Sequence, residues 1–400
     1  MKSIIIVAGV FPKRSETFIS QHALGLVRRG WKVYVLSMRV GDGISGTELN
    51  ELDRAGIRRI YTGFGATNIW KYRFHVLLYL LCNLNNFSHF CKRGRFRLTE
   101  IAIALKYAKK IYEINADIMH VHFGSIAAPL SQVGVNVRTV VTWHGIDANV
   151  IPKIRGSAYY NTLKRSNFLN SVGSDFMINR LKELGFQNES IKKIPMGVDT
   201  SKFYFVERNA EINVPFQIIS VGRLDEMKGH AYLIEACHEL SLQGYDISLK
   251  IIGDGCLHEE LESQINRLDL ADKVELLGGK TTEQVRTRLV KADLFALAGV
   301  SAKDGRVETQ GVAIIEAQAT GLPVVTCDVG GVSESMIDRE TGILCESKNI
   351  EEIVSAIRLY INNLELRLMH GSSAREFVTG QFSIEKMIDR FEETYAEIVL

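Results

Sequence analysis

The chain has 400 residues, of which 46% are hydrophobic and 24% are charged, and its formal net charge at pH 7 is +2. A net charge this small does not indicate a general binder of polyanions, so we expect no nucleic acid partner. The length allows two domains of about 200 residues, each large enough for its own hydrophobic core. No segment reaches the roughly 18 consecutive apolar residues that a membrane-spanning helix requires.

The charges are unevenly divided between the two halves of the chain. Residues 1–190 carry 26 Lys and Arg against 12 Asp and Glu, whereas the remainder carries 22 against 34. This division is typical of an enzyme whose first domain faces an anionic surface or acceptor, and chance asymmetry is the alternative. Residues 1–10 are too short for a signal peptide and predict a first buried strand.

Strand-like runs alternate with helical runs along most of the chain, a pattern that favours parallel sheets covered by helices on both faces. The expected strands are residues 3–8, 33–38, 118–122, 138–142, 167–172, 216–221, 247–252, 273–277, 293–297, 323–326 and 343–345. A polar stretch within residues 188–214 breaks the alternation and indicates a link between two domains. Residues 382–400 carry apolar side chains at helical spacing, which predicts a last helix.

Residues 69–98 interrupt this rhythm. Residues 70–81 are rich in aromatic residues and leucine, and Lys92, Arg93, Arg95 and Arg97 follow after a short polar gap. Apolar insertion combined with cationic attraction is typical of a helix on an anionic membrane surface. An ordinary core helix with a basic loop is the alternative.

Two cations follow the strand at residues 216–221. Arg223 lies in the turn, and Lys228 comes directly before Gly229 and a predicted helix over residues 230–243. A lysine and a glycine at a helix entrance favour binding of an anion such as a phosphate. The alternative is that both cations form surface salt bridges.

Two glutamates, Glu308 and Glu316, are separated by seven residues. The first lies in a polar, glycine-containing stretch, and the second lies within an apolar run, 312–319, that predicts a buried helix. Amides of Gln310, Gly311 and Val312 would then point out of the helix N-terminus and favour an anion. A site for a phosphate, a ribose and a sugar indicates a nucleotide-sugar, whereas the alternative is a salt-bridged pair of glutamates without a ligand.

These segments resemble the retaining glycosyltransferases of family 4, and the resemblance covers most of residues 190–380. It continues through Leu249–Gly255, Val274–Gly278, Ala292–Leu297 and Thr326–Glu334. Three segments of the first half resemble the subgroup that builds bacterial exopolysaccharides such as colanic acid, namely Val10–Phe18, Asp117–Gly124 and Thr142–Asp147.

The resemblance implies an α/β GT-B fold with two Rossmann-like domains that face each other across a cleft. Residues 1–190 would bind the acceptor, and residues 191–381 would bind the nucleotide-sugar. The last helix, residues 382–400, would pack back on the first domain. The family also implies an acceptor that is lipid-linked or a saccharide, a place in bacterial surface polysaccharide synthesis, and a cytoplasmic protein that contacts the inner face of the membrane peripherally.

Roles for individual residues follow from the same resemblance. Arg223 and Lys228 would neutralise the diphosphate of a UDP- or GDP-sugar. Glu316 would hold the ribose hydroxyls, and Glu308 would lie against the transferred sugar together with the amides of Gln310, Gly311 and Val312. We expect no cofactor, and the absence of an Asp-x-Asp pair, which holds a divalent ion in another glycosyltransferase class, predicts chemistry without a metal.

The first half supplies fewer candidates. His144 follows a predicted strand, where a cleft residue belongs, and we expect it to be catalytic. His120 and His122 face the same way on a strand, but a metal site there lacks a third ligand, so His122 is an expected acceptor-side residue. Ser15, Glu16 and Thr17 join that set, because the turn after the first strand has only one glycine and these residues would do the polar work there. Asp147, from the segment Thr142–Asp147 that resembles the exopolysaccharide subgroup, completes the acceptor-side set.

Two other functions remain open at this stage. A non-hydrolysing sugar-nucleotide epimerase shares the two-domain fold but carries a different set of carboxylates and histidines. A catalytically inactive protein that binds sugar nucleotides is the other. The six cysteines, at 82, 91, 237, 256, 327 and 345, show no metal-binding spacing, so we expect reduced thiols in the cytosol.

Overall fold

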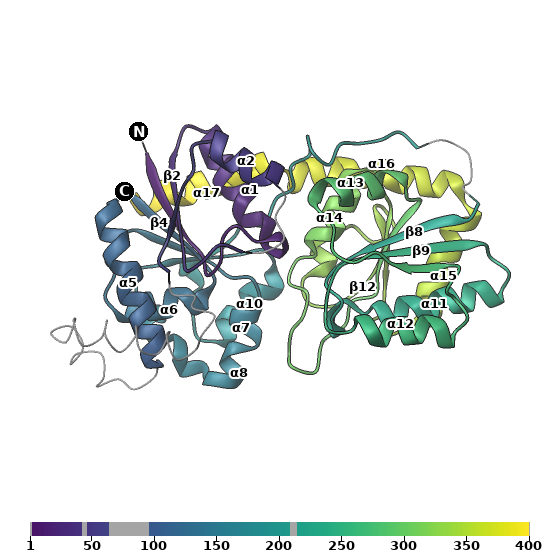
Figure 1. Ribbon diagram of the computed structural model, residues 1–400, viewed down its shortest axis with the longest axis horizontal. Helices are drawn as coiled ribbons and strands as arrows, with labels where there is room; N and C mark the ends of the chain where they lie inside the picture. Colours follow the sequence, from purple (N-terminus) through teal and green to yellow (C-terminus); the bar gives the residue numbers. More distant parts are fainter. Residues whose placement is uncertain (1, 42–45, 64–95, 209–213, 400) are drawn as a thin grey trace. The chain divides into compact units, whose positions relative to one another are not determined.

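The computed structural model describes residues 2–41, 46–63, 96–208 and 214–399. The chain divides into two compact units (Figure 1). The first unit comprises residues 1–173, 177–194 and 388–400, and the second comprises residues 174–176 and 195–387. Each unit is built on one parallel sheet with helices connecting its strands.

The first unit contains a seven-stranded sheet of order β3-β2-β1-β4-β5-β6-β7. Its strands are β1 (Ser3–Val7), β2 (Lys32–Ser37), β3 (Arg58–Tyr61), β4 (Ile118–His122), β5 (Thr139–Thr142), β6 (Leu169–Val172) and β7 (Ile191–Lys193). Its helices are α1 (Thr17–Arg28), α2 (Gly46–Arg54), α5 (Leu98–Ile114), α6 (Gly124–Gln132), α7 (Ile146–Asn149), α8 (Ile151–Arg155), α9 (Asn161–Lys164) and α10 (Asp175–Glu183). Most of helix α17 (Ile384–Val399), drawn in yellow in Figure 1, also belongs to this unit.

The second unit contains a six-stranded sheet of order β10-β9-β8-β11-β12-β13. Its strands are β8 (Phe216–Val221), β9 (Ile247–Ile252), β10 (Val274–Leu276), β11 (Leu294–Leu297), β12 (Val324–Cys327) and β13 (Gly342–Cys345). Its helices are α11 (His230–Leu242), α12 (His258–Arg267), α13 (Thr282–Lys291), α14 (Val312–Ala319), α15 (Ile350–Asn362) and α16 (Leu364–Gln381). Arg223 and Lys228 therefore lie in the segment that follows β8, whereas Glu308 and Glu316 lie in the segment that follows β11.

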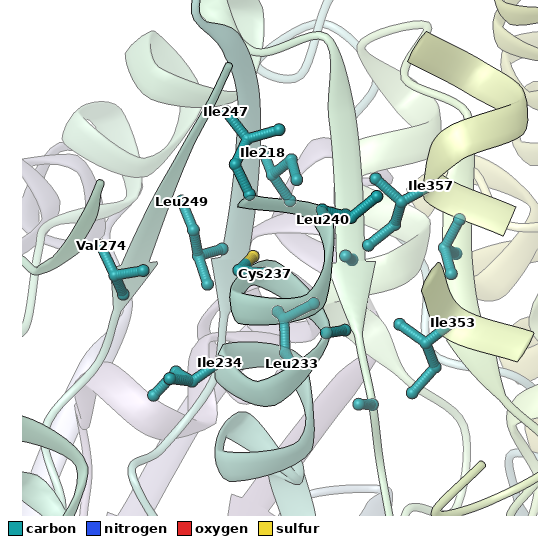
Figure 2. Close-up of a cluster of buried hydrophobic side chains, with 14 of the residues drawn as sticks. Ile218, Leu233, Ile234, Cys237, Leu240, Ile247, Leu249, Val274, Ile353 and Ile357 are labelled. Atoms are coloured by element: carbon teal, nitrogen blue, oxygen red, sulfur yellow. The ribbon is translucent and has the colours of Figure 1, made fainter. Parts of the chain in front are cut away.

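A core of aliphatic side chains fixes α11 on the sheet of the second unit. Figure 2 shows Leu233, Cys237 and Leu240 of α11 pointing at strand residues such as Leu249 and at Ile357 of α15. All five are fully buried. Because packing at this density leaves little freedom for the helix, the position of its first turn, which follows Lys228, is fixed as well.

The sequence predicted the central strands and missed the two outer strands of the first sheet. The parallel α/β architecture is confirmed, and every expected strand is present within two residues of its predicted bounds. The strands β3 and β7 were not predicted, because their sequences, Arg-Arg-Ile-Tyr and Ile-Lys-Lys, are short and polar. Both lie at an edge of the sheet, where a strand is less buried and its apolar pattern is weak.

The aromatic and basic stretch at residues 70–97 lies outside the described residues, except for its last two positions. The membrane-surface interpretation of that stretch therefore stays a prediction. Among the helices of the described residues, none is long and apolar enough to cross a bilayer.

Candidate active site

Lys228 is held at the entrance of α11 by the backbone around it. After β8, the chain makes a single 3-10 turn over Glu226–Lys228, and Gly229 then adopts a left-handed conformation with φ +63° before the helix begins. A Cβ atom on Gly229 would lie 1.7 Å from the carbonyl oxygen of Ala298. The turn thus requires glycine both for its φ angle and for its close approach to the segment after β11.

Lys228 forms an ion pair with Glu308, 80 positions further along the chain. Their side chains are only 14% and 15% exposed, and Glu308 Oε1 also accepts a hydrogen bond from the Gly311 amide at 3.3 Å. Burial opposes the charge on Glu308, but the Lys228 ammonium, the Gly311 amide and Arg223 together lower the pKa of this carboxyl below its ordinary value. Glu308 is therefore ionised at neutral pH.

Two glycines after β12 support the loop that carries Glu308. The Gly331 amide donates to the Glu308 carbonyl at 3.0 Å. Gly330 has φ +62°, and a Cβ atom there would lie 2.0 Å from the same carbonyl oxygen. The Gly-Gly pair was recognised in the sequence only as part of the family pattern. The contact of this pair with the Glu308 carbonyl depends on the fold and has no signal in the sequence.

The turn before α14 is fixed by the side chain of Gln310. This buried amide accepts from the Met196 amide and donates to the Met196 carbonyl, each at 2.8 Å. Gly311 follows as the N-cap, and α14 spans the residues expected for it, Val312–Ala319. Glu308 thus lies on a loop and Glu316 within a helix, as predicted. The binding of an anion by the amides of Gln310, Gly311 and Val312 stays a prediction.

Glu316 differs from Glu308, because the described part of the chain places no counter-charge in contact with it. Among the residues that the structure describes, none forms a hydrogen bond or an ion pair with its carboxylate. Burial raises the pKa of Glu316 to about 7, well above the ordinary glutamate value. A carboxylate without a partner in such surroundings would gain from hydroxyl groups that donate to it.

Arg223 is more accessible than Lys228. Its side chain is 53% exposed, and it lies 3.3 Å from Asp225, which is also bound by Arg306 at 2.7 Å. The Asp225 carboxylate therefore contacts the guanidinium groups of two arginines of the second unit. The exposed guanidinium can reorient toward a ligand at little cost, since an exposed ion pair contributes little to stability.

In the first unit, His144 follows β5 in a loop organised by Asp147. The carboxylate of this buried aspartate accepts from the amides of His144, Gly145 and Ala148 at 3.2, 2.9 and 3.1 Å. It also accepts from the Gly124 amide at 2.8 Å. Asp147 is fully buried, and these contacts make it a positioning residue for the loop. The acceptor-side role expected for it stays a prediction.

His144 lies against aromatic rings and a second histidine. Its ring centroid is 4.3 Å from that of Phe18 and 4.7 Å from that of Phe123. Its Nε2 atom is 3.0 Å from Nδ1 of His122, which is fully buried. Burial lowers the pKa of His144 to about 3, so the ring is neutral at physiological pH.

The remaining expected residues, Ser15, Glu16 and Thr17, lie where α1 begins. Ser15 is exposed, Glu16 forms an ion pair with Lys13, and Thr17 is the first residue of the helix. The structure adds His22 from the same helix, which the sequence did not single out. Ring nitrogens of His22, His120 and His122 lie within 4.8 Å of one another. No spacing pattern links His22 to the two histidines of β4, and only folding brings them together.

Two family descriptions match successive parts of the chain. The description "Glycosyltransferase Family 4" matches residues 15–202, and "Glycosyl transferases group 1" matches residues 205–377. The chain belongs to glycosyltransferase family 4. The family resemblance that the motifs carried is thereby confirmed.

Relatives of this family 4 protein match along most of their length. A protein provisionally named colanic acid biosynthesis glycosyltransferase WcaL, from Escherichia coli K12, is 29% identical over 88% of each chain. The amylovoran biosynthesis glycosyltransferase AmsK of Erwinia amylovora is 28% identical over 87% of this chain and 88% of its own. The N-acetyl-alpha-D-glucosaminyl L-malate synthase of Bacillus anthracis is 26% identical over 90% of this chain and 94% of its own.

Solved structures share the fold over the whole chain. A glycosyltransferase of Rickettsia africae has a TM-score of 0.74 at 22% identity, with 100% of this chain and 98% of that one covered. Alr3699/HepE of Anabaena, solved with UDP-glucose, has a TM-score of 0.75 at 18% identity, with 99% and 100% covered. At this identity the likeness concerns the fold alone, and it confirms the GT-B class for the family 4 protein.

The glycine before α11 provides a first test of the site. Gly229→Ala should lower the free energy of unfolding much more than Gly244→Ala. Gly244 has a similar left-handed φ of +84°, but no atom lies within 4 Å of the position that its Cβ would take. The left-handed conformation alone costs about 1–2 kcal/mol for a residue other than glycine, and only Gly229→Ala adds a clash. Urea denaturation of both variants measures the difference. Equal losses would show that the close contact with Ala298 does not constrain this turn.

Glu316 provides a test based on pH. Because its pKa is about 7 when folded and near 4.5 when unfolded, the folded state favours the protonated form. Ionisation therefore destabilises the native protein progressively as pH rises from 4.5 to 7. At about 1.4 kcal/mol per pKa unit, Glu316→Gln should gain up to about 3 kcal/mol over wild type at pH 8 and close to nothing at pH 4.5.

The free energy of unfolding at pH 4.5 and at pH 8 measures this gain. Replacement of the exposed Glu376 of α16 by Gln is the matched control. A gain for Glu316→Gln that is the same at both pH values would contradict the assignment of a partly buried carboxylate without a partner among the described residues.

Proposed function

We propose that this protein is a retaining glycosyltransferase that moves a sugar from a nucleotide-sugar to a lipid-linked or saccharide acceptor in bacterial surface polysaccharide synthesis. The relatives named for colanic acid and amylovoran biosynthesis support this proposal. HepE, which shares the fold, was solved with UDP-glucose, which supports a UDP- or GDP-sugar as donor. The second unit binds this donor, and the first unit binds the acceptor.

The buried pair of Lys228 and Glu308 is the observation that carries the proposal. Lys228 lies just before α11 and Glu308 lies in the loop before α14, and both side chains are mostly buried. Burial of a charge costs free energy, so their retention there indicates a function. A diphosphate bound there takes Glu308's place as the partner of Lys228, with Arg223 as a second cation. The released Glu308 carboxylate then faces the transferred sugar and stabilises the positive charge that develops at its anomeric carbon.

Nucleotide binding uses the neighbouring helix. The amides of Gln310, Gly311 and Val312 receive a phosphate at the N-terminus of α14. Glu316 accepts hydrogen bonds from the ribose hydroxyls, which provide the partners that its carboxylate otherwise does not have among the described residues. These contacts hold the donor in place while charge accumulates on the leaving diphosphate.

Transfer with retention follows from attack on the face that the diphosphate leaves. The bond between the anomeric carbon and the phosphate oxygen breaks, and the acceptor oxygen forms the new bond on the same face. The departing phosphate takes the proton of the acceptor hydroxyl. Lys228 and Arg223 lower the barrier by stabilising the leaving group, and His144 is a neutral hydrogen-bonding partner of the sugar.

No divalent ion is needed for this chemistry, because two cationic side chains serve the diphosphate. We place the reaction at the cytoplasmic face of the membrane, where a lipid-linked acceptor is available. The basic character of residues 1–190 supports peripheral attachment to anionic lipid. Ser15, Glu16, Thr17, His122 and Asp147 are the proposed acceptor-side set. His122 and Asp147 are fully buried, so they act on the acceptor side through His144 and its loop.

A donor screen distinguishes the proposed function from its alternatives. Wild-type protein is incubated with UDP- and GDP-sugars and with membrane extract as a source of acceptor, and the products are identified by mass spectrometry. Free nucleoside diphosphate together with a glycosylated acceptor is the expected result. An isomeric sugar nucleotide would identify an epimerase instead, and binding without turnover would identify an inactive binding protein.

Removal of either cation should slow transfer. Lys228→Ala and Arg223→Ala should each lower turnover by one to several orders of magnitude, because such a donor to developing charge is worth about 2.7–4 kcal/mol. Arg267→Ala is the matched control, since Arg267 is an arginine of the same unit whose side chain is 71% exposed. Initial rates at saturating donor measure the effect. Turnover that survives both substitutions, or that is abolished by EDTA and restored by magnesium, would reject the mechanism.

A further inference from the structure

Seven polar groups of the first unit form one continuous chain of hydrogen bonds that ends at His144. The chain starts at Ser171 of β6, whose hydroxyl lies 2.5 Å from that of Thr142 on β5. Thr142 contacts His120 Nε2 at 2.7 Å, and Nδ1 of the same ring contacts the Tyr395 hydroxyl at 2.6 Å. The chain thereby crosses from the sheet to helix α17.

The second half of the chain returns from α17 to the candidate site. The Tyr395 hydroxyl also contacts His22 Nε2 at 3.0 Å, and His22 Nδ1 lies 3.2 Å from His122 Nε2. His122 Nδ1 then contacts His144 Nε2 at 3.0 Å. The side chains of His22, His120 and His122 are fully buried. Tyr395 is 1% exposed and packs against Phe391.

The four histidines of this hydrogen-bond chain, His22, His120, His122 and His144, are neutral. Burial lowers the pKa of His22 and of His144 to about 3, and it lowers the pKa values of His120 and His122 well below the ordinary value. A neutral imidazole has one N–H donor and one nitrogen lone pair. Each ring must therefore donate on one side and accept on the other, and none can donate to both neighbours.

This rule links the tautomer of each ring to that of the next. Among the described residues, the Tyr395 hydroxyl contacts no acceptor other than His120 and His22, so it donates to one ring and accepts from the other. If it donates to His120, then His22, His122 and His144 must all carry their proton on the nitrogen that points back along the chain. If it donates to His22, all three rings have the opposite tautomer.

We propose that this chain acts as a positioning network that sets which ring nitrogen of His144 carries the proton. The residues His122, His22, Tyr395 and His120 do not touch the substrate and act through His144. In one state Nε2 of His144 is the donor and Nδ1 is an acceptor, and in the other state these roles are exchanged. Because all contacts must reverse together, His144 keeps one hydrogen-bonding pattern as long as the network as a whole does not reverse.

Metal binding is the competing explanation for the same cluster. Two histidine nitrogens that share a tetrahedral zinc ion at about 2.0–2.1 Å lie somewhat more than 3 Å apart, and the His22 to His122 distance of 3.2 Å is compatible with that. The short contacts of His120, however, are to the hydroxyl groups of Thr142 and Tyr395. The hydrogen-bond chain accounts for both nitrogens of His22, His120 and His122 without an ion.

Removal of one hydroxyl tests the network. Tyr395→Phe interrupts the chain at its centre and leaves the ring packing in place. Protein labelled with ¹⁵N-histidine reports the tautomer of His144 through the shifts of its two ring nitrogens, assigned with His144→Gln. Wild type should show one neutral tautomer, with one pyrrole-type and one pyridine-type nitrogen. Tyr395→Phe should show values averaged between the two tautomers.

The matched control is Tyr360→Phe, which removes an equivalent buried hydrogen bond, from Tyr360 to His370 at 2.7 Å, in the second unit. It should leave the His144 signals unchanged. If Tyr395→Phe does not fold, His22→Phe interrupts the chain one position closer to His144. An unchanged single tautomer of His144 in a folded variant of either kind would overturn the proposal, and so would a stoichiometric metal ion in purified wild type that is lost in His22→Gln.

The kinetic consequence rests on the proposed function and is measured separately. Loss of the group that orients a metal-ligating histidine typically costs 10- to 100-fold. We expect a loss of similar size for the orientation of His144, so kcat of Tyr395→Phe should fall about 10-fold or more while the KM for donor stays constant. A fall in donor affinity with kcat unchanged would reject the positioning role. Because the tautomer is measured without substrate, absence of any transferase activity in wild type would reject the proposed function and leave the tautomer result in force.

Discussion

The ion pair between Lys228 and Glu308 is the interaction on which the organisation of the second unit's site depends. Two opposite charges in a mostly buried place are tolerable only while each has a partner, because removal of one leaves the other uncompensated. The surrounding backbone keeps the two side chains in contact. Gly229 allows the tight turn that leads into α11, and Gly330 allows close packing against the loop that carries Glu308. In the proposed function a diphosphate supplies the negative charge that Lys228 requires, and the released Glu308 carboxylate faces the positive charge that develops on the transferred sugar.

The candidate site of the first unit consists of neutral groups instead of an ion pair. Its candidate residue, His144, is neutral and lies among aromatic rings, and the groups behind it are neutral as well. The proposed glycosyl transfer would use both kinds of environment. Charge belongs at the leaving group, where negative charge develops, whereas a sugar hydroxyl is recognised by neutral donors and acceptors of defined direction. The ionic and the neutral half of the proposed chemistry thus come from different units.

The sequence predicted most of the fold, and it named candidate site residues one by one without their contacts. Central strands and the bounds of α14 followed from apolar periodicity, since buried parallel strands and buried helices have the clearest patterns. The edge strands β3 and β7 have no such pattern. Lys228 and Glu308 were each singled out, yet their mutual ion pair is a contact across 80 residues that no local pattern encodes. His22 was missed for the same reason, because its partners lie on β4 and α17.

A crystal structure of the protein with a bound nucleoside diphosphate tests the central claim most directly. The account predicts that the Lys228 ammonium lies within hydrogen-bonding distance of a diphosphate oxygen, at about 3 Å, and that Glu308 no longer contacts it. The ribose hydroxyls should contact Glu316 in the same structure. An intact pair of Lys228 and Glu308, with the diphosphate bound by other residues, would contradict the account.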